Sequence, residues 1–312
     1  MKKILITGAL GHIGSKLIHE IKPNDFGGVI LFDNLSTQRY CSLFNLPDNV
    51  PFQFIEGDVL QENLEKYFEG VDIVIHLAAI TNAAGSFEIQ DQVEKVNYEG
   101  TKKVAEACQK FGCKLIFLSS TSVYGTQDVL VDEDCSKEEL KPQSPYAESK
   151  LKSEELLKKM STETGLKYVV FRFGTIFGTS IGMRFHTAVN KFVWQACMGI
   201  PLTVWSTALN QKRPYLDIAD ATRALRFVIG KNIFDNNIYN VLTTNATVSE
   251  IVEIIRSDIP DVSVKLVDER IMNQLSYEVS CEKFKKLGFK FGGDLRKGIK
   301  DTIRLLKNCR TT

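Results

Sequence analysis

The stretch "SPYAESK" carries a tyrosine and a lysine four residues apart, Tyr146 and Lys150, at the start of a helix expected over Tyr146–Met160. Residues at this spacing lie on one face of a helix. A phenol with a pKa near 10 is a poor base at neutral pH. A nearby ammonium stabilises its phenolate by up to about 4 kcal/mol at an effective dielectric of about 20, before desolvation opposes the effect. The pair is therefore a candidate general base toward an alcohol.

The position of this pair is more informative than its spacing, because Tyr98 and Lys102 in "NYEGTK" repeat the spacing. Tyr146 follows a predicted strand that ends in "LSSTSVYG", and this strand brings hydroxyl side chains such as Ser120 to the carboxyl edge of a sheet. A hydroxyl there can donate to an oxygen that gains negative charge. The arrangement suits deprotonation of an alcohol while a nicotinamide accepts the adjacent hydride.

Three glycines in "GALGHIG" follow the first predicted strand and open a helix expected over His12–Ile21. Glycines at such a turn let the backbone approach a pyrophosphate, and the free N–H groups of the helix start favour its negative charge. A tight turn without a ligand is the alternative. The position of the glycines within a strand–helix–strand unit favours dinucleotide binding.

The next strands also end in polar or small residues. The second ends at Asp33, whose distance along the chain from Gly14 is that expected for a carboxylate that hydrogen-bonds a ribose 2′-hydroxyl. This carboxylate predicts NAD, while Arg39 nearby leaves NADP open. "GDV" and "HLAA" end the third and fourth strands; His76 is expected to be a packed residue, and the alanines fit either a close cofactor or simple packing. The predicted cofactor site comprises Gly8, Gly11, His12, Ile13, Gly14, Asp33, Asn34, Asp58, Val59, Leu77, Ala78 and Ala79.

The elements that must position these groups alternate along the first half of the chain. Six apolar runs, from "KKILITG" to "KYVVFRFG", are separated by segments of helical period. This order predicts a parallel sheet with both faces covered by helices. We expect an α/β fold: a Rossmann-type doubly wound parallel sheet over 1–174 that binds NAD, and a smaller mixed α/β substrate domain over 175–312. Some later segments should return to the first domain, and helices are expected near Ile218–Ile229 and Val248–Ser257.

The composition excludes several classes of function. The 39 basic and 38 acidic residues are balanced and form no dense basic run, so nucleic acid and anionic membranes are not expected partners. No apolar run approaches the roughly 20 residues of a membrane helix. The 7 cysteines form no CxxC pair and do not cluster with the 4 histidines, so we expect no metal site and a reducing cytoplasm with free thiols.

Taken together, "GALGHIG", "FDN", "LSSTSVYG" and "SPYAESK" resemble the extended short-chain dehydrogenase/reductase family, the NAD-dependent sugar-nucleotide epimerases and dehydratases, over nearly the whole chain. The resemblance implies that Tyr146 is the catalytic base and that Lys150 lowers its pKa and holds the nicotinamide ribose. It places Ser120 at the catalytic Ser/Thr position, and Asn97 and Thr101 on the cofactor side.

The resemblance also implies a nucleotide-sugar substrate and a homodimer built through four helices, two from each chain, at about Asp91–Phe111 and Tyr146–Met160. Arg213 matches the diphosphate-binding arginine of the family, and guanidinium suits a bidentate grip on phosphate. Thr175 stands where many relatives carry an asparagine, which puts that contact in doubt. The expected substrate-binding residues are Ser120, Thr121, Tyr146, Thr175, Arg184, Asn190 and Arg213.

The residues after Ser120 bear on the type of reaction. Family dehydratases carry an Asp-Glu pair there, whereas this chain has Thr121 and Ser122, whose hydroxyls are unsuited to that proton transfer. We therefore expect hydride chemistry at sugar C4 without dehydration, either a 4-epimerase or a 4-dehydrogenase. A GDP-linked manno-heptose or hexose for a surface (capsule) polysaccharide is the substrate that the resemblance suggests. An NAD(H)-binding regulator without turnover is the alternative, against which the complete Ser–Tyr–Lys set argues.

Overall fold

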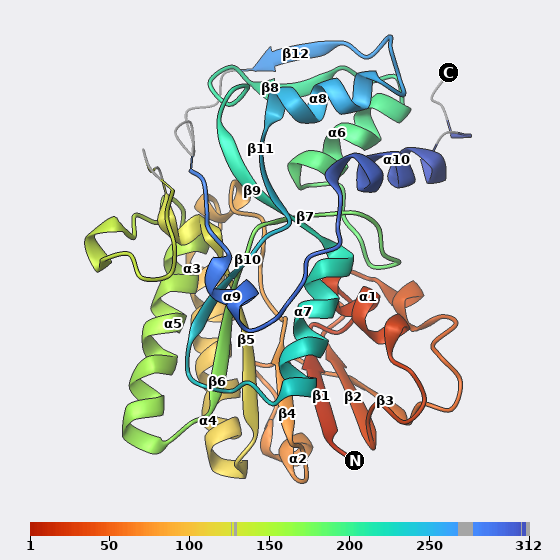
Figure 1. Cartoon of the computed structure of the whole chain (residues 1–312). Coiled ribbons are helices and arrows are strands. Elements are labelled where there is room, and N and C mark those ends of the chain that lie inside the picture. Colours follow the sequence, from red (N-terminus) through yellow and green to blue (C-terminus); the bar gives the residue numbers. More distant parts are fainter. Residues whose placement is uncertain (126, 128–129, 268–276, 307, 310–312) are drawn as a thin grey trace.

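The computed structural model describes residues 1–125, 127, 130–267, 277–306 and 308–309. Its main element is a seven-stranded parallel sheet in the order β10-β6-β5-β4-β1-β2-β3, in the lower half of Figure 1. The strands are β1 (Lys3–Thr7), β2 (Gly28–Asp33), β3 (Phe52–Glu56), β4 (Ile73–His76), β5 (Lys114–Ser120), β6 (Tyr168–Phe173) and β10 (Ile238–Val241). The predicted doubly wound Rossmann-type sheet is confirmed.

Helices cover both faces of this sheet, because successive side chains of each strand point to opposite faces and both sets are apolar. Ile4 and Ile6 of β1 belong to a buried cluster on the face of α1 (His12–Glu20), α7 (Ile218–Lys231) and α9 (Glu282–Lys286). Leu5, between them, belongs to the opposite cluster. That face is covered by α2 (Glu65–Phe68), α4 (Gly100–Phe111) and α5 (Pro145–Thr164). The two layers are visible on either side of the sheet in Figure 1.

The helix expected over Asp91–Phe111 is not one regular α-helix. It starts as α3 (Gln90–Val93), continues as a π-helical turn (Glu94–Glu99) and becomes α4. Asn97 lies in the π-helical turn and is fully buried. Such turns occur frequently at functional sites, and periodicity alone gives no sign of them.

The helix that carries the Tyr/Lys pair is longer than expected: it begins at Pro145, within the quoted stretch, and ends at Thr164, beyond the expected end at Met160. Ser144 caps its N-terminus by accepting from the N–H of Ala147, Pro145 occupies the first turn, and Gly165 ends it in the left-handed conformation (φ 76°). These local signals fix where the first turn of α5 stands relative to β5.

The upper part of Figure 1 contains two small sheets and three helices around a separate apolar cluster. One sheet has the order β11-β9-β7 and the other pairs β12 with β8. The elements are β7 (Thr175–Phe177), α6 (Ala188–Cys197), β8 (Leu202–Trp205), β9 (Lys212–Asp217), β11 (Thr244–Thr247), α8 (Val248–Arg256), β12 (Val264–Val267) and α10 (Leu295–Leu306). None of the helices in the described part of the chain is long and apolar enough to span a membrane.

Candidate active site

Ser120, Tyr146 and Lys150 meet at the carboxyl end of β5. Ser120 ends the strand, and its hydroxyl oxygen accepts from the N–H and the hydroxyl of Ser122. Tyr146, in the first turn of α5, shares a hydrogen bond with Ser120. Lys150 lies one turn further, 4% exposed, with its Nζ donating to Leu118 O at 2.7 Å. The three predicted catalytic side chains are thus brought together.

The electrostatics of the pair differ from the sequence-based expectation. Burial raises the pKa of Tyr146 to about 12, against the opposing effect of its hydrogen bond with Ser120. Burial lowers the pKa of Lys150 to about 7, against the opposing effect of Glu154. The Lys150 ammonium lies 6.0 Å from the centroid of the Tyr146 ring and is directed at Leu118 O. Desolvation dominates for both groups in this structure, and Lys150 is not among the groups that act on the pKa of Tyr146; that Lys150 lowers this pKa stays a prediction.

A buried ion pair lies behind this set. Arg172 of β6 donates from Nε and Nη2 to the two carboxylate oxygens of Glu154, at 3.0 and 2.7 Å, and both side chains are 3% exposed. Ser119 Oγ donates to the same carboxylate at 2.5 Å. Glu154 lies one helical turn beyond Lys150, so the pair joins α5 to the two strands that carry the site.

Asn97 fixes α5 against the end of β4. Its side chain accepts from Ile80 N at 2.8 Å and donates to Ile80 O at 3.0 Å and to Ser149 Oγ at 3.1 Å. Thr101 accompanies it, donating to Asn97 O and lying 3.1 Å from Nε2 of His76. Asn97 therefore holds the backbone of Ile80 and the helix residue before Lys150, and Thr101 holds the backbone of Asn97.

A second tyrosine that the sequence analysis missed lies beside Tyr146. Tyr277 shares a hydrogen bond with Thr121, and its proximity contributes to the raised pKa of Tyr146. Arg213 of β9 lies 5.7 Å from the centroid of the Trp205 ring and acts electrostatically on Tyr277. Thr121 and Arg213 therefore lie in the same region as the catalytic set, and their contact with substrate stays a prediction.

The other predicted substrate residues have different surroundings. The Asn190 side chain is 1% exposed, and both of its amide atoms bond to the backbone of Gly178 at 3.3 Å, so it shapes the segment between β7 and α6. Thr175 starts β7 and pairs with Tyr215 of β9. Arg184 donates to Thr81 Oγ1 at 2.5 Å, which places it at the segment that follows β4.

Gly8 and Gly14 of the glycine turn are packed too closely for a side chain. Gly8 has φ +64°, and a Cβ on it would lie 2.6 Å from Ala78 N; a Cβ on Gly14 would lie 2.4 Å from Ala9 O. Leu77 N donates to Thr7 O, which sets the end of β4 against the turn. The close approach of the two backbones thus requires glycine at position 8.

Asp33, which ends β2, borders this turn, and Asp58 follows β3. Asp33 accepts from Leu10 N and Leu35 N, both at 3.0 Å, and Asn34 donates to Asp58 at 3.2 Å. Val59 is buried beside Gly100, whose Cβ would meet it at 3.1 Å. Ile13 packs against the core. Asp33 thus lies beside the glycine turn, and its contact with a ribose hydroxyl stays a prediction.

Two buried polar atoms at the turn support the fit of a phosphate-containing cofactor. His12 Nε2 and Arg39 Nη2 are inaccessible and have no hydrogen-bond partner among the described residues. Both belong to donors that can face an anion at the N-terminus of α1, where the first turn holds no acidic residue. The residues present therefore fit the diphosphate of a dinucleotide.

Gly182 lies in the segment between β7 and α6, and its substitution tests whether this segment packs directly against the glycine turn. A Cβ on Gly182 would lie 2.3 Å from Leu10 O and 2.8 Å from Gly11 O. We expect G182A to lower the free energy of unfolding by about 1–3 kcal/mol through overpacking, and to weaken NAD binding about tenfold, measured by thermal melting and calorimetric titration.

The matched control is G230A. Gly230 lies within α7 and a Cβ there would meet nothing within 4 Å. Alanine should stabilise this helix by about 0.5–1 kcal/mol and leave NAD binding unchanged. Equal NAD affinity in G182A and the unsubstituted chain would contradict the claim that the packing of Gly182 against the glycine turn supports NAD binding.

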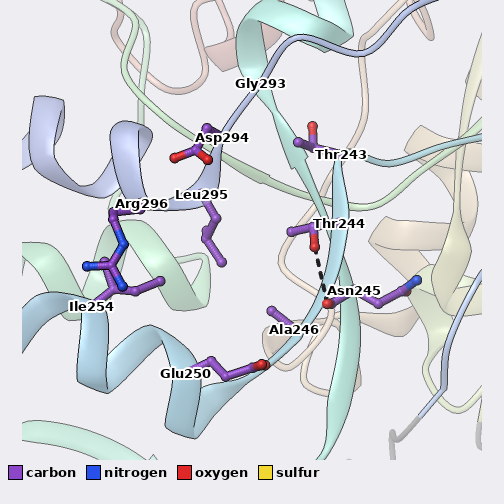
Figure 2. A pocket seen from close by; sticks show the side chains of 10 residues that line it. All are labelled: Thr243, Thr244, Asn245, Ala246, Glu250, Ile254, Gly293, Asp294, Leu295 and Arg296. Atoms are coloured by element: carbon purple, nitrogen blue, oxygen red, sulfur yellow. Dashed lines mark hydrogen bonds between the residues drawn. The ribbon is translucent and has the colours of Figure 1, made fainter.

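A polar hollow elsewhere does not belong to this site. Figure 2 shows its lining residues, which come from β11, α8 and the start of α10, and its volume is about 410 Å³. Glu250 is engaged in the capping box of α8 and Asp294 accepts from Lys297 N, so these carboxylates cap helices. In the described part of the chain, no group of three or more His, Cys, Asp or Glu residues is placed to hold a metal.

Parallel strands that end at a glycine turn and at a Ser–Tyr–Lys set are the arrangement of Rossmann-type enzymes that use NAD. The model of the NAD dependent epimerase/dehydratase family matches residues 4–241, and the chain belongs to this family. NAD is therefore its cofactor.

Individual relatives agree with this assignment. The chain is 32% identical over 238 residues to an uncharacterized UDP-glucose epimerase of Bacillus subtilis (strain 168), covering 73% of each chain. It is 30% identical over 324 residues to a trifunctional UDP-glucose 4,6-dehydratase/epimerase/reductase of Arabidopsis thaliana, covering 97% of this chain but 46% of that protein. The solved structure of UDP-glucuronic acid 4-epimerase from Bacillus cereus with UDP-glucuronic acid and NAD is 25% identical, with a TM-score of 0.87, covering 98% and 99% of the two chains.

Proposed function

We propose that this protein is an NAD-dependent 4-epimerase of a nucleotide-activated sugar. The observation that carries the proposal is the shared hydrogen bond of Tyr146 and Ser120 at the carboxyl end of β5, on the same sheet edge as the glycine turn. The sugar C4 hydroxyl is the group that these two side chains would contact. NAD, when bound, supplies the acceptor for the hydride that leaves C4.

Each protein group has a distinct part in this mechanism. Tyr146 takes the proton of the C4 hydroxyl through its phenolic oxygen, and Ser120 donates a hydrogen bond to the oxygen that becomes a carbonyl. Lys150, whose ammonium is buried beside Phe117, supplies positive charge that favours the tyrosinate once it turns from Leu118 O toward the site. Thr121 and Tyr277 orient the sugar, and Arg213 holds the diphosphate.

The residues after Ser120 favour epimerisation over elimination of water. Thr121 donates to Phe173 O at 3.3 Å, and Ser122 is hydrogen-bonded to Ser120, so neither presents a carboxylate. Elimination of water needs an acid and a base with pKa values near the working pH, which two hydroxyls do not provide. A 4-dehydrogenase would differ by releasing the ketone, and the test below distinguishes it.

Several finer predictions remain proposals. The names of the relatives given above contain UDP-sugars, so we propose a UDP-sugar as the substrate. A GDP-linked manno-heptose or hexose is the alternative substrate, which the test below includes. We propose that 175–312 supplies most substrate contacts. The homodimer through the helices at 90–111 and 145–164 is likewise proposed, from the resemblance to the family. The cytoplasmic location stays a prediction.

The function is tested by incubating the purified protein with UDP-, GDP- and dTDP-sugars, following NADH absorbance and the product by NMR. We expect inversion at C4 of at least one UDP-sugar without accumulation of NADH. Stoichiometric NADH or a released ketone would indicate the 4-dehydrogenase, and a 4-keto-6-deoxy product would indicate a dehydratase. NAD binding without conversion of any sugar would favour the regulator.

A further inference from the structure

His12 is the first residue of α1, and its ring is turned toward the segment between β7 and α6. Its Nδ1 lies 3.2 Å from Ser180 Oγ, and Ser180 Oγ donates to His12 O at 2.9 Å. The other ring nitrogen, Nε2, is inaccessible and without a partner. The side chain is therefore held in place by one nitrogen and leaves the second for another group.

Two guanidinium groups and a second imidazole, from two other segments, face His12. Arg39 comes from the segment after β2, and Arg184 and His186 come from the segment between β7 and α6. Arg39 Nη1 lies 3.6 Å from the position of a Cβ on Gly11, so its guanidinium borders the glycine turn. Asp33 is the carboxylate that acts on Arg39, and no carboxylate is among the groups that act on His12.

This environment keeps the imidazole neutral. Burial, followed by Arg39, His186 and Arg184, lowers the pKa of His12 to about 3. The positive end of the α1 dipole acts in the same direction. A diphosphate at the N-terminus of α1 carries two negative charges, which would reverse the sign of the local field and favour the imidazolium.

We propose that His12 takes up a proton when the diphosphate of a dinucleotide binds, so that Nε2 becomes a charged donor facing the anion together with Arg39 and Arg184. Binding of NAD is then coupled to proton uptake, and affinity rises as the pH falls. The inference rests on the NAD dependence of the family and is independent of which sugar the enzyme converts.

His76, at the end of β4, is fully buried, and its contacts exclude it from this role. Its Nδ1 lies 2.7 Å from Thr7 Oγ1 and its Nε2 lies 3.1 Å from Thr101 Oγ1, so both nitrogens have partners. Burial and the nearby Lys150 lower its pKa to about 3. It lies beneath the sheet edge between two threonines and presents no donor to a ligand.

The test is calorimetric titration of the nucleotide-free protein at about pH 6, in two buffers of different ionisation enthalpy, which gives the number of protons taken up on binding. The ligands are NAD, ADP-ribose, which keeps the diphosphate without the nicotinamide, and adenosine, which has no phosphate. We expect uptake of about one proton with NAD and with ADP-ribose and none with adenosine, and about tenfold tighter binding per unit of pH lowered between about pH 6.5 and pH 5.

Two substitutions locate the proton, with thermal melting as the check on folding. H12Q should lose at least half of the uptake, and H12F, which has no titratable ring, should do the same. H19Q is the matched control, because His19 lies on the same helix but its Nε2 is 3.0 Å from Ser42 O; it should keep the full uptake. No uptake in the unsubstituted protein, or the same uptake in H12Q and H12F, would overturn the proposal, whatever the sugar panel shows.

Discussion

Replacing Tyr146 by phenylalanine should lower kcat about a thousandfold or more while NAD affinity stays within about twofold. The substitution removes the phenolic oxygen that shares a hydrogen bond with Ser120, and it keeps the ring that packs near Lys150. Turnover is measured on the sugar that the panel identifies, and NAD affinity by calorimetry. A variant that retains activity would show that another group removes the proton.

Y277F is the matched control for this prediction. Tyr277 is the neighbouring buried tyrosine, bonded to Thr121, so its hydroxyl is a candidate for the same proton transfer. We expect a loss of only about tenfold, mainly in KM, because one hydrogen bond to the substrate contributes about 1 kcal/mol. A loss in Y277F equal to that in Y146F would reverse the roles of the two residues.

Removal of one partner of the Glu154–Arg172 pair should be the most destabilising single change outside the apolar core. R172L leaves the Glu154 carboxylate at 3% exposure without its bidentate partner. We expect the free energy of unfolding to fall by about 3–5 kcal/mol, measured by denaturant titration. The double variant E154L/R172L should recover most of the loss, because an apolar pair removes the unpaired charge.

The control for this prediction is the next residue along the helix. Glu155 pairs with Lys137 at 3.2 Å, with side chains 57% and 79% exposed. E155Q should change stability by less than about 1 kcal/mol, since exposed ion pairs contribute little. Similar losses in R172L and E155Q would mean that the buried pair has no special role in stability.

The parallel sheet was predictable because each of its first six strands is an apolar run bounded by a clear break. The strand missed is β10, "IYNV", which is short and follows a stretch of helices and turns. Its place beside β6 depends on a contact between residues far apart in the chain, and local patterns carry no information on such a contact. The same holds for the small sheets, in which β7 pairs with β9 and β8 with β12.

The catalytic set was predictable because motif order and sheet topology place it at one edge. Its electrostatics were not, because the pKa values depend on burial and on where the Lys150 ammonium points. The position of Tyr277 beside Tyr146 was not predictable either, because the two residues lie far apart in the sequence. One signal was available for the buried ion pair: Arg172 interrupts the apolar run "KYVVFRFG", and a charge within a buried strand needs a partner.

The strand β10 has a consequence for how the chain is made. β6 leaves the ribosome with one edge unpaired, and the strand that covers that edge is synthesised only after β7, α6, β8, β9 and α7. At ordinary elongation rates this delay is on the order of several seconds, during which an exposed strand edge can pair with another nascent chain. The nucleotide-binding half therefore cannot complete its sheet during translation before most of the chain has emerged.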